Sequence, residues 1–160
     1  MSLYQAVNSA GDTIFEIGSD GGISTQTMIV KGRDESIAEE TRVQNDDELF
    51  FSVGASEYWT GEVCAFVSCG SATPGFSFDF RGPIGTTFFY GDSFSGTAVS
   101  SGAVGFTQSS GDHLYVLKFS ISVGVAAGTI NFRWAQNASS RDTTTVKEKS
   151  YLKAASFISL

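Results

Sequence analysis

The sequence predicts an all-β fold, an antiparallel sandwich or barrel, and three observations support this prediction. Fourteen Phe with only two Pro and two Met indicate a core filled by aromatic rings, and aromatic and β-branched residues suit a half-buried pleated surface. Eighteen Gly separate the apolar runs, as turn residues do. Apolar and polar residues alternate within several runs, which is typical of antiparallel strands with one wet face.

The first element is a predicted N-terminal hairpin. Residues 13–17 and 23–31 flank the run Gly18-Ser19-Asp20-Gly21-Gly22, whose Gly and Asp tolerate the backbone angles of a tight turn. The hairpin has few apolar residues, and an isolated hairpin is marginally stable. We therefore expect it to pack on a neighbouring element or on another copy of the chain.

The central region of the chain begins with two short predictions. Residues 34–43 lack a strong helical stripe, so they predict an edge strand rather than a helix. Asn45-Asp46-Asp47 predicts a turn. Asp46, Asp47 and Glu48 have the oxygen ligands that calcium prefers, but three adjacent acids do not converge easily, so a solvated turn is the favoured interpretation.

The remaining strands follow at regular intervals. Phe76, Phe78 and Phe80 share one face of a strand, and Ile130, Phe132 and Trp134 share one face of another. Strands separated by Gly-rich turns, with no helix between them, exclude a βαβ architecture. We expect these strands at residues 48–53, 57–69 with a break or kink near Gly61, 74–81, 86–90, 103–108, 115–123, 130–134 and 150–158.

The charge of the chain excludes two classes of partner. Seventeen acidic and ten basic residues give a formal net charge of −7, which opposes binding to nucleic acid and to anionic membranes. No apolar run approaches the roughly 20 residues that a membrane span needs. The N-terminus lacks a basic segment followed by an apolar core, so we expect no signal peptide and synthesis in the cytoplasm.

The residues that bear chemistry are few. Cys64 and Cys69 are five apart and would face opposite sides of one strand, so we expect buried free thiols. The run Phe88-Phe89-Tyr90-Gly91-Asp92-Ser93 resembles the strand and Gly-Asp-Ser entry of the SGNH esterases. That chemistry needs a His positioned as a base, and the single His113 lies at the start of a different predicted strand. We predict no enzyme, and no catalytic, cofactor or metal site.

A resemblance to a family rests on three runs of residues. These are Asp46-Asp47-Glu48-Leu49-Phe50-Phe51, the alternating run from Pro74 to Thr86, and Gly128-Thr129-Ile130-Asn131-Phe132-Arg133-Trp134-Ala135-Gln136-Asn137 with Thr143–Val146 and Ser150–Ala154 after it. Together they resemble a group of tailed-bacteriophage minor structural proteins, over roughly residues 35 to 158. Trp134 is expected in the core, and the amides of Gln136 and Asn137 are expected to bond loop backbone.

The resemblance implies a β-sandwich that tends to form trimers and carries no catalytic residues. We therefore expect an N-terminal arm or hairpin of residues 1–33, used for attachment or contacts between subunits, and a jelly-roll-like sandwich of residues 34–160. The implied location is the virion, after synthesis in the host cytoplasm. The expected partners are two further copies of the chain and the major capsid protein or tail proteins.

Two roles within a virion remain open. A capsid decoration (cement) protein fits a short chain without a fibrous stalk. The alternative is a tail-fibre or receptor-binding knob that recognises a host-surface glycan or protein through loops and aromatic side chains. The candidate contact residues for such a ligand or partner are Tyr58, Trp59, Phe88, Phe89 and Tyr90.

Overall fold

The computed structural model describes residues 4–7, 13–17, 23–93 and 98–157, with side chains from residue 25 onward. These described residues form β-strands joined by turns and loops, and they contain no helix that could span a membrane. The strands are β1 (Tyr4–Val7), β2 (Thr13–Ile17), β3 (Ile23–Ser24), β4 (Gln26–Val30), β5 (Glu35–Ile37), β6 (Gln44–Val53), β7 (Tyr58–Cys69), β8 (Phe76–Arg81), β9 (Thr87–Asp92), β10 (Ala98–Val99), β11 (Val104–Phe106), β12 (Gly111–Ser122), β13 (Gly128–Ala135), β14 (Thr144–Val146) and β15 (Tyr151–Phe157).

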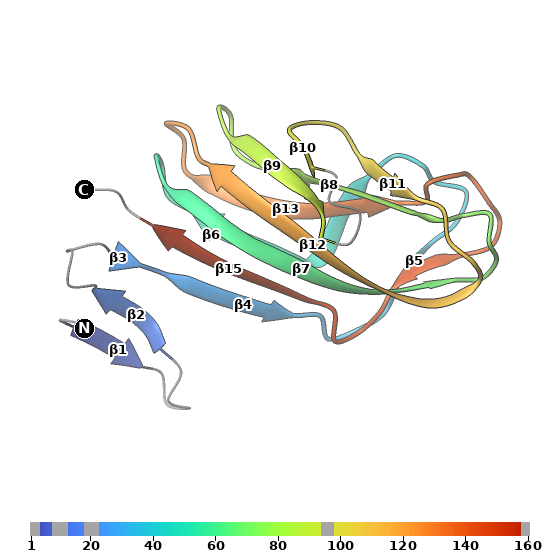
Figure 1. Cartoon of the computed structure of the whole chain (residues 1–160), viewed down its shortest axis with the longest axis horizontal. Helices are drawn as coiled ribbons and strands as arrows, with labels where there is room; N and C mark the ends of the chain where they lie inside the picture. Colours follow the sequence, from blue (N-terminus) through green and yellow to red (C-terminus); the bar gives the residue numbers. More distant parts are fainter. Residues whose placement is uncertain (1–3, 8–12, 18–22, 94–97, 158–160) are drawn as a thin grey trace.

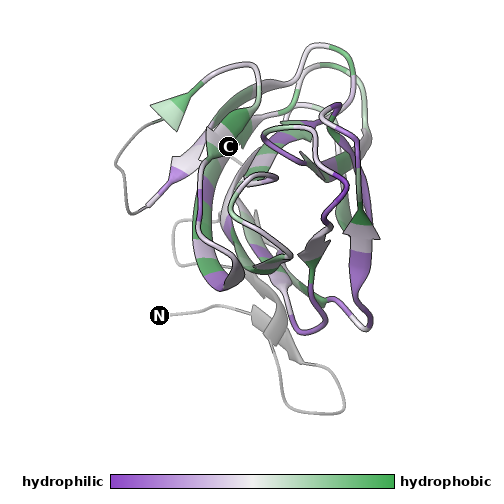
Figure 2. Ribbon diagram, turned by 90° about the vertical axis from the view of Figure 1, so that its right-hand side faces the viewer, coloured by the Kyte–Doolittle hydropathy of each residue, from purple (hydrophilic) through white to green (hydrophobic). Residues whose placement is uncertain are grey.

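Two antiparallel sheets form the sandwich, and they face each other around a common core (Figures 1 and 2). The larger sheet has eight strands, of which β10, β9, β12 and β7 lie side by side in that order. The far edge of β7 pairs with β15 along its first part and with β14 along its last part. β4 pairs with β15, and β5 pairs with β14. The smaller sheet has the order β11-β8-β13-β6. The prediction of an antiparallel β-sandwich is confirmed.

The strand order is that of a jelly roll. Eight principal strands, taken along the chain, are β4, β6, β7, β8, β11, β12, β13 and β15. The first, eighth, third and sixth lie side by side in the larger sheet, and the second, seventh, fourth and fifth form the smaller one. This interleaving of two Greek keys brings strands from both ends of the chain into contact. β9 and β10 extend the larger sheet beyond β12.

The N-terminal strands form a separate small sheet of order β1-β2-β3 (Figure 1). β2 pairs with β3 through Ile17 and Ile23, at the predicted hairpin, whose turn at residues 18–22 lies outside the described residues. Among the described residues, β1 and β2 pair with no strand of the sandwich. β4, however, lies in the larger sheet against β15. The arm of residues 1–33 stays a prediction as a unit, but its residues 26–30 are a strand of the sandwich.

Most predicted strands are present, and two local predictions are wrong. β7 runs unbroken through Gly61, where a Cβ would meet the Lys153 carbonyl oxygen and the Phe119 ring. Glycine therefore allows close packing there rather than a kink. The predicted turn at Asn45-Asp46-Asp47 lies within β6, because Asp46 is buried and bonded instead of solvated. The predicted edge strand at residues 34–43 forms only as β5.

The core is a continuous stack of aromatic rings contributed by both sheets. Phe76, Phe78 and Phe80 of β8 project inward, as their alternation predicts, and Phe78 stacks on Phe106 with ring centroids 6.0 Å apart. Phe80 meets Phe119 of the opposite sheet at 5.0 Å. Aromatic contacts across the two layers add to the stabilisation from apolar burial.

A buried lysine joins β4 to the smaller sheet. The Lys31 side chain is fully buried, and its Nζ donates to Glu35 Oε2 at 2.8 Å and to Asp46 Oδ1 at 2.9 Å. Glu48 Oε2 lies 3.7 Å away. Burial alone would lower the pKa of Lys31, but the bonds to Glu35 and Asp46 outweigh it and leave that pKa raised. The lysine ammonium is thus the cation that these acids surround.

Asp46 is the most connected side chain of this group, which we call the Asp46 network (Lys31, Glu35, Asp46 and Trp134). Asp46 Oδ1 also accepts from the backbone N–H groups of Glu48 and Leu49, and Oδ2 accepts from Trp134 Nε1 at 3.1 Å. The backbone of Lys31 bonds to the turn before β15, donating to the Ser150 carbonyl at 2.7 Å and accepting from Lys149 N at 2.8 Å. One carboxylate therefore ties β6 to β13 and to the end of β4.

Gln136 has a similar structural role just after the end of β13. It is fully buried, its Nε2 donates to the Asp142 carbonyl at 2.7 Å, and its Oε1 accepts from Ser140 N at 3.0 Å. The amide holds the loop of residues 137–142 closed, as expected from the sequence. Trp134 is fully buried in the core. These residues of the Trp-Ala-Gln-Asn run are structural.

Removing the Asp46 carboxylate should therefore destabilise the sandwich more than removing its neighbour. We expect Asp46→Ala to lower the free energy of unfolding by about 3–5 kcal/mol, because Lys31 loses a buried counter-charge. Asp47→Ala is the matched control: its pair with Arg33 is exposed, so the expected loss is below about 1 kcal/mol. Urea denaturation followed by tryptophan fluorescence measures both, and equal losses would contradict this role of Asp46.

Candidate interaction surface

The five aromatic residues predicted as ligand contacts do not form one surface. Tyr58 and Phe89 are 55% and 64% exposed on the solvent side of the eight-stranded sheet, which we call the outer face. Trp59 and Tyr90 are only 5% and 3% exposed in the core, and Phe88 packs against it. Successive side chains of a strand point to opposite faces. The prediction is therefore wrong for Trp59 and Tyr90.

The polar atoms of the two buried rings have partners inside the protein. Trp59 Nε1 donates to Glu57 Oε2 at 2.9 Å, and the Tyr90 hydroxyl donates to the Gly102 carbonyl at 2.6 Å. Burial raises the pKa of Tyr90 to about 12. Both side chains thus stabilise the sandwich.

The residues weighed for chemistry have structural surroundings. Gly91 and Asp92 end β9 as paired strand residues, and Ser93 N donates to the Val116 carbonyl at 3.0 Å. The His113 ring donates from Nε2 to the Ser109 carbonyl at 2.9 Å. Cys64 and Cys69 are buried free thiols, as predicted, and burial raises the pKa of Cys64.

The acids weighed as a calcium site are not brought together around an open position. Asp46 is buried against Lys31 and Trp134, whereas the Asp47 side chain is exposed and pairs with Arg33 at 3.2 Å. Within the stretch of the chain that the structure describes, no group of three His, Cys, Asp or Glu has an arrangement suited to a metal ion.

The outer face collects most of the exposed large hydrophobic side chains of the described residues. Seven of the ten project from it, and the antiparallel register arranges them in rows across the strands. A row of Lys118, Glu62 and Lys153, which ends at Met28, runs between two groups formed by the other six. The seven are Met28, Val30, Tyr58, Phe66, Phe89, Leu114 and Phe157.

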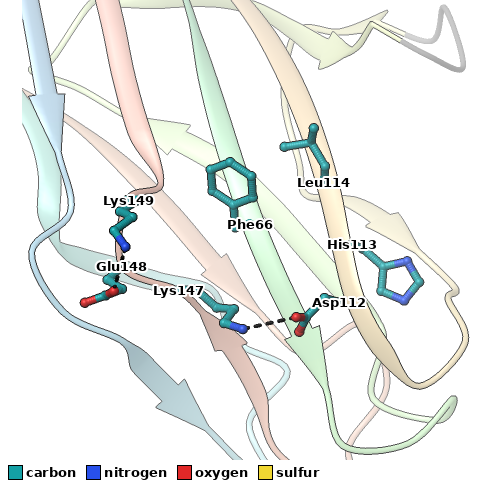
Figure 3. Close-up of a pocket in the computed structure, with 7 residues that line it drawn as sticks. All are labelled: Phe66, Asp112, His113, Leu114, Lys147, Glu148 and Lys149. Atoms are coloured by element: carbon teal, nitrogen blue, oxygen red, sulfur yellow. Dashed lines mark hydrogen bonds and ion pairs between the residues drawn. The ribbon is translucent and has the colours of Figure 1, made fainter.

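A shallow pocket of about 450 Å³ opens on this face beside Phe66 and Leu114. These two side chains stand opposite each other on β7 and β12, and Figure 3 shows them above a charged rim. Lys147, Glu148 and Lys149 lie along one side of this rim and Asp112 and His113 along the other, and Lys147 Nζ donates to Asp112 Oδ2 at 3.1 Å. Hydrogen bonds from Ser68 and Lys147 lower the pKa of Asp112. The pocket is an apolar floor within a ring of mixed charge.

A second apolar site lies on the end of the sandwich where β15 finishes and β3 leads into β4, which we call the arm end (Figure 1). The loops of residues 82–86 and 123–127 meet there, and a Cβ on Gly124 would lie 2.8 Å from the Gly85 carbonyl oxygen. Gly85 has φ +84°, a conformation that favours glycine. The two loops present Ile84 and Val125, which are 89% and 92% exposed.

The sequence carries a signal for some of these residues. Tyr115, Leu117 and Phe119 fill one face of β12, but Leu114 and Val116 interrupt the polar pattern on the other face. Two apolar residues at outward positions of one strand are therefore the sequence signal for the apolar part of this face. The outward position of Ile84 depends on the approach of its loop to Gly124, which is not visible in the sequence.

Comparison with known proteins adds little. No protein-family model matches the sequence, and no curated protein matches it either. A chain in the structure of infectious bursal disease virus Gx strain is similar with a TM-score of 0.26 and 13% sequence identity, over 96% of this chain and 43% of that chain. This likeness is too distant to carry an argument about function.

Proposed function

We propose that this protein is a non-enzymatic structural protein of a bacteriophage virion, a trimeric capsid decoration protein at the particle surface. The observation that carries the proposal is the concentration of exposed hydrophobic side chains on the outer face and at the arm end. Clusters of exposed apolar side chains often mark sites of contact with other molecules. A jelly roll is also common among viral capsid domains, although a fold alone does not assign a function.

The resemblance to tailed-phage structural proteins supports this proposal because the residues that carry it stabilise the sandwich. Asp46, Trp134 and Gln136, which carry the resemblance, all hold the sandwich together. A chain that shares them shares an architecture rather than an active site. The proposed role therefore needs contact surfaces and no catalytic group.

The outer face is the proposed contact between copies. The chain as a whole carries −7, so like-charge repulsion opposes association through most of its surface. On and beside the outer face, however, the positive and negative side chains nearly balance. Three copies of this apolar face meeting around a three-fold axis would bury it. The charged residues concerned are Lys118, Lys147, Lys149 and Lys153 with Glu62, Asp112 and Glu148.

The arm end is the proposed contact with the capsid. The strands of the arm are paired with one another, and they leave the sandwich at the end where the loops of residues 82–86 and 123–127 also lie. Attachment through this end would stabilise the shell by mass action, because a protein that binds assembled capsomers and not free ones shifts the equilibrium toward assembly. The opposite end would then face solvent.

A receptor-binding knob is the second candidate function, and one observation favours it. Tyr58 and Phe157 are cross-strand neighbours, and both are exposed on the outer face. Exposed aromatic side chains suit the faces of sugar rings or a protein epitope. Binding of the isolated protein to host cells, together with a handful of copies per particle, would favour this role.

We expect Leu114→Glu to shift the trimer toward monomers by at least about tenfold in dissociation constant, because it places a charge in the apolar floor. Sedimentation equilibrium measures the shift. Phe50→Glu is the control, since Phe50 is an exposed hydrophobic residue on β6 of the other sheet. A wild-type chain that stays monomeric, or equal effects of both variants, would contradict the proposed contact.

We expect loss of the arm or of the loop tips to weaken attachment to particles. Deletion of residues 1–22 spares β4 and Lys31, and Ile84→Ser with Val125→Ser removes the exposed aliphatic groups. Each should lower the number of copies bound per particle at least about tenfold, and Phe50→Ser should not.

The readout is quantitative mass spectrometry of purified particles, counting this chain against the major capsid protein. A copy number at a simple lattice fraction supports decoration. Complete absence of the chain from particles would refute the virion assignment.

A further inference from the structure

A polar pocket of about 340 Å³ lies on the four-stranded sheet, and its lining includes no outer-face residue and neither Ile84 nor Val125. Its lining comes from the segment before β6, the first two residues of β6, the last residue of β8 and one residue of β13. Three arginines line it, Arg42, Arg81 and Arg133, together with Glu40, Gln44 and Asn45.

This pocket differs from the rest of the described surface in that two of its arginines form no ion pair with a described carboxylate. All ten Lys and Arg lie among the described residues, and seven of them form ion pairs with described carboxylates. The three that form none among these residues are Arg42, Arg81 and Lys153. Two of the three therefore line the same pocket, in a chain whose net charge is −7.

Arg133 is paired with a carboxylate, and Glu40 supplies the negative charge of the lining. Arg133 makes a bidentate pair with Asp79, donating from Nε at 2.7 Å and from the guanidinium Nη2 at 2.6 Å. Glu40 Oε1 accepts from the backbone N–H of Arg42 at 2.6 Å. The guanidinium groups of Arg42 and Arg81 form no ion pair with a described residue, so they are the groups that can bind an anionic ligand.

We propose that this pocket binds a saccharide that carries a carboxylate. Guanidinium groups recognise planar carboxylates with paired hydrogen bonds. The amides of Gln44 and Asn45 both donate and accept, as sugar hydroxyls require. The volume falls within the range of small-molecule sites, about 300–1,000 Å³. This binding site is independent of the proposed attachment to a capsid, because none of its lining residues belongs to the loops of residues 82–86 and 123–127.

Isothermal titration calorimetry of the full chain tests the proposal with sodium glucuronate, glucose and inorganic phosphate as probes. We expect glucuronate to bind at least about tenfold more tightly than glucose, and more tightly than phosphate. Arg81→Ala and, separately, Arg42→Ala should weaken glucuronate binding at least about tenfold. Lys153→Ala is the matched control, because it removes an exposed positive charge from the other sheet, and it should change the affinity less than about twofold.

Circular dichroism checks that each variant folds, and Arg42→Ala decides the test if Arg81→Ala does not fold. Three results would overturn the proposal. They are equal affinity for glucuronate and glucose, tighter binding of phosphate than of glucuronate, and an equal loss in Lys153→Ala.

Discussion

The buried contact between Lys31 and Asp46 is the interaction on which the rest of the structure depends. It joins the end of β4 to β6, and Asp46 extends it to Trp134 on β13. Two buried charges gain stability only when their remaining polar atoms are also bonded, and here Glu35 and two backbone N–H groups complete the set. The jelly-roll order places the first, second, seventh and eighth strands together at this point.

The surfaces proposed for function lie around this framework. The larger sheet has its far edge closed by β15 and β4, which are held by the Asp46 network through Lys31 and Ser150. This closure leaves Met28 and Val30 of β4 exposed on the outer face. Contact between copies, attachment to a capsid and the arginine pocket then use three different regions of one sandwich.

The sequence predicts a structural feature correctly where the feature depends on neighbouring residues. It does not predict a feature that depends on residues far apart along the chain. The alternation of Phe76, Phe78 and Phe80 places a strand and its inward face correctly. Asp46 follows Asn45 and precedes two acids, a run typical of a solvated turn, and its burial depends on Lys31, which is distant along the chain.

The placement of the candidate site residues is likewise visible in the sequence only where the evidence is local. Period-2 alternation within β7 and β9 is enough to distinguish the buried Trp59 and Tyr90 from their exposed neighbours, so this distinction is visible in the sequence. The proximity of Arg42 and Arg81 is not visible there, because it depends on the order of strands in the smaller sheet.

A double-mutant cycle on Lys31 and Asp46 tests the central claim most directly. Lys31→Met, Asp46→Asn and the double variant are compared by urea denaturation, with the free energy of unfolding as the measured quantity. If the pair is coupled, the double variant loses about 1–3 kcal/mol less than the sum of the single losses, because neither charge is left alone. Additive losses, within about 0.5 kcal/mol, would contradict the account.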